Sequence, residues 1–165
     1  MKIKPQASSE LTKLGELIAD MRVAMLTTFE VDEKALMSRP MSPQEMCEKG
    51  AIWFLTDPNS HKVQYLQVIN LGFSNESDGT YVSISGHGEI VDDRERIKSL
   101  WSPFARPWFP DGVDSSNLAL LKFVPHSAEY WDSTHSKMVR MLAMAASIIV
   151  AKPIGMGDNG ILNVL

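Results

Sequence analysis

The sequence predicts a mainly β fold, an antiparallel β-barrel with packed helices. Six or seven short segments are rich in strand-forming residues, and turn residues separate them. The helical segments are inserted between groups of strands and do not alternate with single strands, which is typical of such a barrel. A chain of 165 residues fits one domain, and it contains no repeat and no linker, so we expect residues 1–165 to form one unit.

The chain opens with a predicted helix and a predicted hairpin. Apolar residues at helical spacing predict a helix over 10–22, with Ser8 or Ser9 as its N-cap. The segment 23–29 is rich in strand formers, and a polar turn separates it from a second such run over 35–41. These two runs predict two antiparallel strands joined by the turn.

The middle of the chain predicts three strands and a short helix. A polar loop over 43–50 precedes a compact strand over 51–56, and Ser60 is expected to cap a short helix. The segment 71–74 is a candidate strand. A Ser-Asp-Gly turn then leads into 81–86, where apolar and small polar residues alternate with a period of two.

The last part of the chain predicts one helix, two strands and a helical tail. Asp92 and Glu95 have the spacing of a capping box, which predicts a helix starting there. Strands are expected at 118–124 and 128–131, and a helical tail is expected from about residue 133.

The segment Gly155–Gly160 matches the spacing of the dinucleotide-binding fingerprint. In that fold the fingerprint follows a strand and is followed by a helix and a second strand. Only five residues follow the match here, so we interpret the match as accidental and the segment as a turn-rich tail.

Composition argues against several classes of function. The 16 basic and 20 acidic residues give a formal net charge of -4, so we expect no general binding of nucleic acid. Cys47 is the only cysteine, which excludes an internal disulfide and favours a reducing, cytoplasmic location. No segment approaches 18 uninterrupted apolar residues, so we expect no signal peptide and no membrane span.

Motifs for metal binding and for hydrolysis are absent from the sequence. No two of the four histidines have metal-ligand spacing, and we therefore predict no metal site. There is no Gly-x-Ser-x-Gly elbow, and Cys47 has no histidine near it in sequence. No residue stands out as a general acid or base, so the catalytic residues, if any, are unknown.

A candidate phosphate site lies where the strand 51–56 gives way to the short helix. Ser60, His61 and Lys62 offer a hydroxyl, an imidazole and an ammonium at a helix start, which favours an anion. Arg39, at a strand end, has a guanidinium suited to phosphate. An ordinary cap with solvated side chains, and an exposed salt bridge for Arg39, explain the same residues.

Two aromatic pairs could flank a flat ring or could belong to the core. These pairs are Trp53-Phe54 and Tyr130-Trp131. In a barrel, aromatic residues of strands more often pack inside.

Taken together, these segments resemble the general stress protein branch of the pyridoxamine phosphate oxidase-like FMN-binding split barrels. The motifs that carry the resemblance in the first half of the chain are Met25-Leu26-Thr27-Thr28, Ser38-Arg39-Pro40-Met41, Trp53-Phe54-Leu55-Thr56 with Ser60-His61-Lys62, and Tyr81-Val82-Ser83-Ile84-Ser85-Gly86. Those that follow are Asp93-Arg94 with Leu100-Trp101, Trp108-Phe109-Pro110-Asp111-Gly112, and Ala128-Glu129-Tyr130-Trp131-Asp132. Each motif is weak alone, but the order and spacing are fairly specific and span nearly the whole chain.

The resemblance implies a six-stranded antiparallel split β-barrel, a homodimer, and FMN in clefts between the two subunits. It implies that Arg39, Ser60, His61 and Lys62 form the element that holds the FMN phosphate. The residues implied to lie along the flavin are Pro40, Met41, Phe54, Leu55 and Thr56. Trp131 either approaches the flavin from the partner subunit or is an interface or core residue. The implied function is an FMN-binding stress protein that is either an oxidoreductase on an unidentified small substrate or a non-catalytic flavin- or cofactor-binding sensor.

Two departures from the oxidase pattern bear on activity. The oxidases usually carry arginine where this chain has His61. They also carry an Arg-x-His-x-Arg pattern where this chain reads Lys137-Met138-Val139-Arg140-Met141. We therefore do not expect this protein to oxidise pyridoxamine phosphate.

Overall fold

The structure is a computed structural model, and it describes residues 1–132 and 158–164. The strands are β1 (Lys2–Ile3), β2 (Ala24–Glu30), β3 (Ala35–Met41), β4 (Pro43–Met46), β5 (Ile52–Thr56), β6 (Ile69–Asn75), β7 (Thr80–Val91), β8 (Ala119–Asp132) and β9 (Asp158–Asn163). The helices are α1 (Ser9–Ile18) and α2 (Arg94–Leu100), with short 3-10 helices η1 (His61–Tyr65), η2 (Pro103–Ala105) and η3 (Gly112–Asp114). The predicted mainly β class is confirmed.

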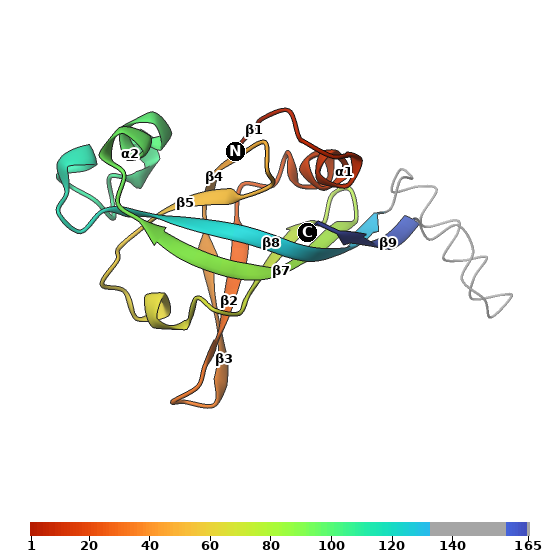
Figure 1. Ribbon diagram of the computed structural model, residues 1–165, viewed down its shortest axis with the longest axis horizontal. Coiled ribbons are helices and arrows are strands. Elements are labelled where there is room, and N and C mark those ends of the chain that lie inside the picture. Colours follow the sequence, from red (N-terminus) through yellow and green to blue (C-terminus); the bar gives the residue numbers. More distant parts are fainter. Residues whose placement is uncertain (133–157, 165) are drawn as a thin grey trace, which may run out of the picture.

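The described strands form one sheet in the order β1-β4-β5-β8-β7-β6-β2-β3, and β9 pairs with β8 (Figure 1). The expectation of six antiparallel strands is wrong in number and in one pairing, because nine strands are present and β1 runs parallel to β4. The extra strands β1, β4 and β9 are short or polar, so they lack the apolar alternation by which strands are found. The predicted loop after Pro43 contains β4, and the predicted turn-rich tail contains β9.

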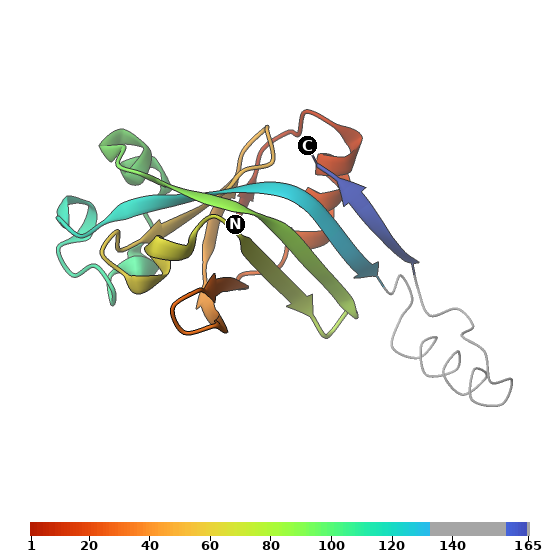
Figure 2. The ribbon, with the colours of Figure 1, turned by 60° about the horizontal axis from the view of Figure 1, so that its bottom comes forward.

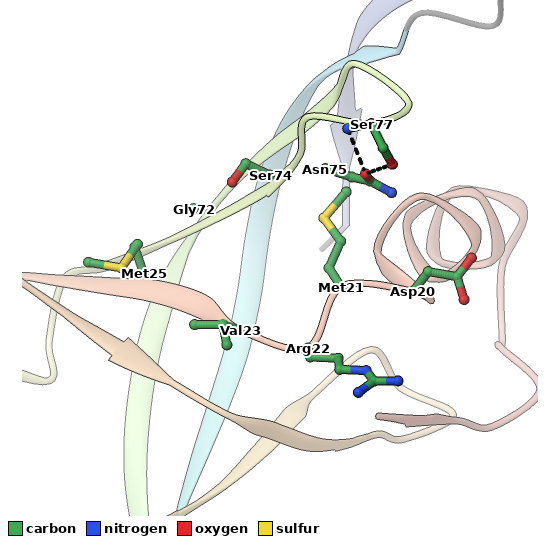
Figure 3. Close-up of a pocket in the computed structure, with 9 residues that line it drawn as sticks. All are labelled: Asp20, Met21, Arg22, Val23, Met25, Gly72, Ser74, Asn75 and Ser77. Carbon is green, nitrogen blue, oxygen red and sulfur yellow. Dashed lines mark hydrogen bonds between the residues drawn. The ribbon is translucent and has the colours of Figure 1, made fainter. Parts of the chain in front are cut away.

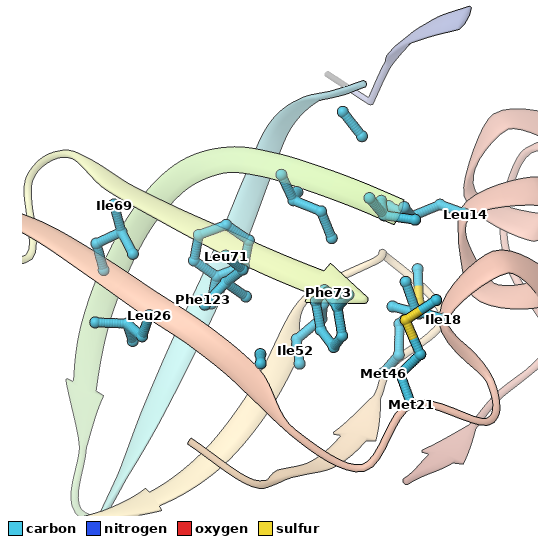
Figure 4. Close-up of a cluster of buried hydrophobic side chains, with 14 of the residues drawn as sticks. Leu14, Ile18, Met21, Leu26, Met46, Ile52, Ile69, Leu71, Phe73 and Phe123 are labelled. Carbon is cyan, nitrogen blue, oxygen red and sulfur yellow. The ribbon is translucent and has the colours of Figure 1, made fainter. Parts of the chain in front are cut away.

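The sheet curls around a single main core, as a barrel does. Leu26 of β2 and Phe54 of β5 lie in one buried cluster, although three strands separate β2 from β5 in the sheet. Phe123 of β8 lies in the same cluster (Figure 4). Helix α1 contributes Leu14 and Ile18 to this core, and both side chains are fully buried.

The caps of both α-helices are built from polar side chains. Ser8 caps α1 as predicted, because its Oγ accepts a hydrogen bond from the backbone N–H of Leu11 at 3.2 Å. Helix α2 is capped by Asp93, one residue after the predicted Asp92, and the Asp93 carboxylate accepts from the N–H of Arg96. Asp92 pairs instead with Arg94.

The two strands expected at 118–124 and 128–131 are one strand, β8, which pairs with β7 along its length (Figure 2). The register shifts by one residue where Pro125 lies opposite Gly86. A bulge there tolerates proline, which has no N–H to donate to the sheet. The bulge also places His126 against His87, with Nε2 2.7 Å from Nδ1, so these histidines meet although they are far apart in sequence.

The predicted helical tail from about residue 133, up to residue 157, lies outside the described residues. None of the helices that are described is long and apolar enough to cross a membrane.

The close approach of β7 and β8 at Gly86 gives a stability prediction. An added Cβ at Gly86 would overlap the carbonyl oxygen of Val124 and lie 2.7 Å from the Phe123 ring. Because a backbone oxygen cannot move aside cheaply, we expect Gly86→Ala to cost at least about 2 kcal/mol of unfolding free energy. Gly72→Ala is the control, since its Cβ would meet nothing nearer than 3.9 Å. Equal chemical denaturation curves for the two variants would contradict this view of the bulge.

Candidate flavin phosphate site

Arg39 is held by side chains of the neighbouring strand β2. It lies opposite Leu26 in the β2–β3 ladder, on the inner face of the hairpin. Its Nη2 donates to the Glu30 carboxylate at 2.7 Å and its Nη1 donates to the hydroxyl of Thr28 at 3.2 Å. The expected alternative, a salt bridge of Arg39, is therefore present, but its acidic partner is buried.

Ser60 and Lys62 lie together at the start of η1. The Ser60 hydroxyl donates to the backbone carbonyl of Asp57 at 2.7 Å and accepts from Lys62 Nζ at 2.8 Å. The predicted short helix is present as the 3-10 helix η1, and Ser60 is its N-cap residue, but the Ser60 hydroxyl makes no cap bond. The hydroxyl instead anchors the ammonium group.

Lys62 and Arg39 are close enough to repel each other. Partial burial lowers the pKa of Lys62, and the positive charge of Arg39 lowers it further, while Asp57 acts in the opposite direction. Arg39 and Lys62 are two cations that lie close together and are partly shielded from water, so an anion bound between them would lower their repulsion. The structure thus places Arg39, Ser60 and Lys62 near one another, and the phosphate role that the family resemblance implies for them stays a prediction.

His61 joins this cluster through the same buried carboxylate. Its Nδ1 lies 3.1 Å from the second oxygen of Glu30, and its half-exposed ring meets Tyr65 edge-on at 5.2 Å. Tyr65 in turn donates to Asp32 at 2.8 Å, and this hydrogen bond raises the pKa of Tyr65 to about 12.

Glu30 is the site residue that the sequence analysis missed. Only 1% of it is exposed, and the hydrogen bond from Arg39 holds its pKa below the usual value. The sequence does contain a signal for a buried Glu30. It lies at every second position after Ala24, Leu26 and Thr28, which places all four side chains on the same face of the strand. A carboxylate on the buried face of a strand requires a cationic partner.

The ligand atoms of Glu30, Glu33 and His61 lie within 4.8 Å of one another, a spacing that could hold a metal ion. Both oxygens of Glu30 are already engaged, one by Arg39 and the other by His61. We therefore describe this group as an ion-pair network.

The strand residues predicted to lie along the flavin fall in different environments. The Phe54 side chain is fully buried in the main core, and its backbone lies between β4 and β8. Leu55 packs on a second buried cluster below α2, and the ring of Trp53 beside it is covered by Arg96 at 5.1 Å. Pro40 is exposed on the edge strand β3, and Met41 is half-buried against the main core.

Thr56, the last residue of β5, is 3% exposed, and its Oγ1 has no hydrogen-bond partner in the described part of the chain. A buried hydroxyl without a partner costs free energy, which a ligand could recover.

Trp131 lies on the outer face of the sheet, opposite Tyr81 of β7, and 48% of it is exposed. Within one chain it therefore lies on the other face of the sheet from Arg39. Its neighbour Tyr130 is buried and donates to Asp158 at 3.0 Å. Phe54 and Tyr130 thus belong to the core, whereas Trp131 remains free to contact another molecule.

A surface hollow of about 590 Å³ lies elsewhere, over β2 and β6 on the outer face (Figure 3). It is lined by Asp20, Met21, Arg22, Val23, Met25, Gly72, Ser74, Asn75 and Ser77. None of the four residues of the predicted phosphate element lines it, so the chemistry of the cluster, and not this hollow, marks the candidate site.

Comparison with known proteins gives concordant findings. The model of the family described as pyridoxamine 5'-phosphate oxidase like matches residues 9–154. Protein bli-3 of Neurospora crassa is 26% identical over 157 residues, which cover 87% of this chain and 75% of that protein.

Solved structures show the same relationship. A crystal structure described as general stress protein 26 from Jannaschia sp. CCS1 is 25% identical with a TM-score of 0.72, over 94% of this chain and 98% of that chain. The general stress FMN/FAD binding protein of Xanthomonas citri is 28% identical with a TM-score of 0.66, over 78% of this chain and 93% of that one.

Proposed function

Because this chain belongs to the pyridoxamine 5'-phosphate oxidase-like family, we propose that it is a flavin-binding general stress protein whose ligand is FMN. The observation that carries the proposal is the proximity of two cations held in place, Arg39 by Glu30 and Thr28 and Lys62 by Ser60. A phosphate placed between them would neutralise two repelling cations. The general stress FMN/FAD binding protein of Xanthomonas citri supports a flavin as the source of that phosphate.

The surroundings of the cluster fit the ring system of FMN. The strand β3 is the last strand in the sheet order of the described residues, so one edge of its backbone is not paired with another described strand. The unpartnered hydroxyl of Thr56 offers a further polar contact. We propose that these groups face the ring, while Arg39, Ser60, His61 and Lys62 hold the phosphate.

Bound flavin would supply the redox chemistry. The residues of this chain would bind the phosphate, orient the ring and exclude water from it. We propose that the protein is an oxidoreductase on an unidentified small molecule. A non-catalytic flavin- or cofactor-binding sensor is the second candidate, favoured because no side chain of the proposed site is placed as an acid or base for a substrate.

One experiment tests ligand and activity together. The purified protein is titrated with FMN, FAD and riboflavin by flavin fluorescence, and the loaded protein is then mixed with NADH or NADPH in air. We expect saturable binding of FMN, and repeated reduction and reoxidation would identify an oxidoreductase. Binding without turnover would favour the sensor, and the absence of binding of every flavin at about 100 μM would overturn the proposal.

We also propose that the protein is a homodimer. Large apolar side chains stand exposed on the outer face of the sheet: Met25, Phe29, Leu36, Tyr81, Trp131 and Ile161. Exposed apolar surface of this kind marks an interface, and a second copy of the chain would cover it.

This proposal predicts that Trp131→Glu raises the dimer dissociation constant about 10-fold or more, because buried aromatic anchors dominate interfaces. Flavin should be lost together with the dimer, since the cleft is proposed to be walled by both subunits. Phe104→Glu is the matched control, as that ring is exposed in η2, away from the sheet face. Light scattering that shows a monomer with stoichiometric FMN would contradict the prediction.

A further inference from the structure

We infer that Glu30 is a positioning residue for the flavin phosphate, which orients Arg39 and His61 and couples FMN binding to the protonation of His61. The inference rests on the proposed function and names a regulation of that same site. The relevant residues come from three elements, namely β2, β3 and η1, which meet only in the folded chain.

The contacts of Glu30 hold the side chains of Arg39 and His61 in place. Its carboxylate is almost completely removed from water, and each oxygen has a cationic or hydrogen-bonding partner from another element. One oxygen accepts from Arg39 Nη2 at 2.7 Å and the other lies 3.1 Å from His61 Nδ1. Since Thr28 accepts from the second terminal nitrogen of Arg39, the plane of the guanidinium is fixed at two points.

Glu30 also determines the net charge of the cluster. The hydrogen bond from Arg39 lowers the pKa of Glu30, so the carboxylate stays ionised at neutral pH. Glu30, Arg39 and Lys62 together carry one net positive charge, which the nearby exposed carboxylate of Glu33 reduces, and a proton on His61 adds one positive charge. A phosphate monoester carries about -1.5 to -2 at pH 7, so the protonated form matches it better.

His61 is the group that can supply the second charge. An imidazole is the side chain that can gain or lose a charge between about pH 5 and 8, and His61 lies in contact with the cluster through Glu30. The other ionisable groups that face it are Tyr65, which stays neutral below about pH 12, and the carboxylates Asp32 and Glu33 of the hairpin turn. FMN binding should therefore take up a proton at His61, and riboflavin binding should not.

The test compares the FMN and riboflavin dissociation constants between pH 6 and 8 in four proteins: the unmodified chain, His61→Asn, Glu30→Gln and Glu48→Gln. The second ionisation of FMN itself, near pH 6, affects all four equally, so each variant is judged relative to the others. Coupling to one proton changes affinity by up to tenfold per pH unit.

Relative to His61→Asn, the unmodified chain should lose 3- to 10-fold of its FMN affinity between pH 6 and 8. Glu30→Gln keeps the shape of the side chain but removes its charge, so its pH profile should resemble that of His61→Asn. Glu48→Gln removes an exposed carboxylate from the turn between β4 and β5, outside this cluster, and should follow the unmodified chain. Riboflavin affinity should show none of these differences.

The outcomes separate the inference from the proposed function. If FMN binds but the pH profiles of all four proteins coincide, Glu30 does not couple His61 to the phosphate and the inference is overturned while the function stands. If FMN fails to bind every one of the four proteins, the proposed function is overturned as well.

Discussion

Lys62→Ala is expected to weaken FMN binding about 10- to 100-fold and to leave riboflavin binding nearly unchanged. A charged hydrogen bond contributes roughly 1.5–3 kcal/mol, and 1.4 kcal/mol corresponds to tenfold in affinity. Ser60 holds Lys62 in the cluster. Because Lys62 is partly buried, water that enters the Lys62→Ala variant cannot fully replace the lost charge as a partner of the phosphate. Fluorescence titrations of both flavins measure the effect.

Two further variants make this test specific. Lys62→Arg keeps the positive charge and should recover a large part of the lost affinity. Lys49→Ala removes an exposed lysine from the turn between β4 and β5 and should change the affinity for neither flavin. Equal losses of FMN and riboflavin in Lys62→Ala would remove Lys62 from the phosphate site.

The parts of the fold that could be predicted are those encoded by local patterns. The helix α1 with its Ser8 cap and the β2–β3 hairpin follow from apolar spacing and turn residues close in sequence. The strand β4 could not be predicted, because proline and glutamate are rare in strands and Pro43 and Glu45 are extended only through pairing with β5 and β1. The continuity of β8 through Pro125 also depends on a bulge that only the pairing with β7 reveals.

The contacts of the candidate site likewise divide into those that local sequence predicts and those that only the folded chain creates. Ser60 and Lys62 are two residues apart, so their contact follows from local sequence, and Arg39 was added to them by resemblance to a family. Glu30 meets Arg39 within the β2–β3 hairpin, but it meets His61 only because η1 packs beside that hairpin. Trp131 lies on the outer face of the sheet, so the flavin contact proposed for it would need a second subunit, which no pattern in one chain can specify.

The FMN-loaded protein is expected not to oxidise pyridoxamine phosphate. The oxidases carry Arg-x-His-x-Arg where this chain has Lys137-Met138-Val139-Arg140-Met141, a segment outside the described residues. Val139 can neither donate nor accept a hydrogen bond through its side chain. Orientation lowers the barrier only if the reacting atoms are held about 3–3.5 Å apart, and such positioning needs polar contacts with the substrate.

Arg140 is one residue away from the expected histidine, but that offset does not compensate. In the helix predicted for this segment, a shift of one residue turns a side chain by about 100° at 3.6 residues per turn. The measurement is anaerobic mixing of pyridoxamine phosphate with the FMN-loaded protein, followed at the visible absorption maximum of the flavin, with dithionite reduction as the positive control. Rapid bleaching, with aldehyde formed and turnover after oxygen is admitted, would show that other residues position this substrate. Persistent absorbance, together with full bleaching by dithionite, would show that the flavin is competent and that the missing contacts with the substrate are what prevent the reaction.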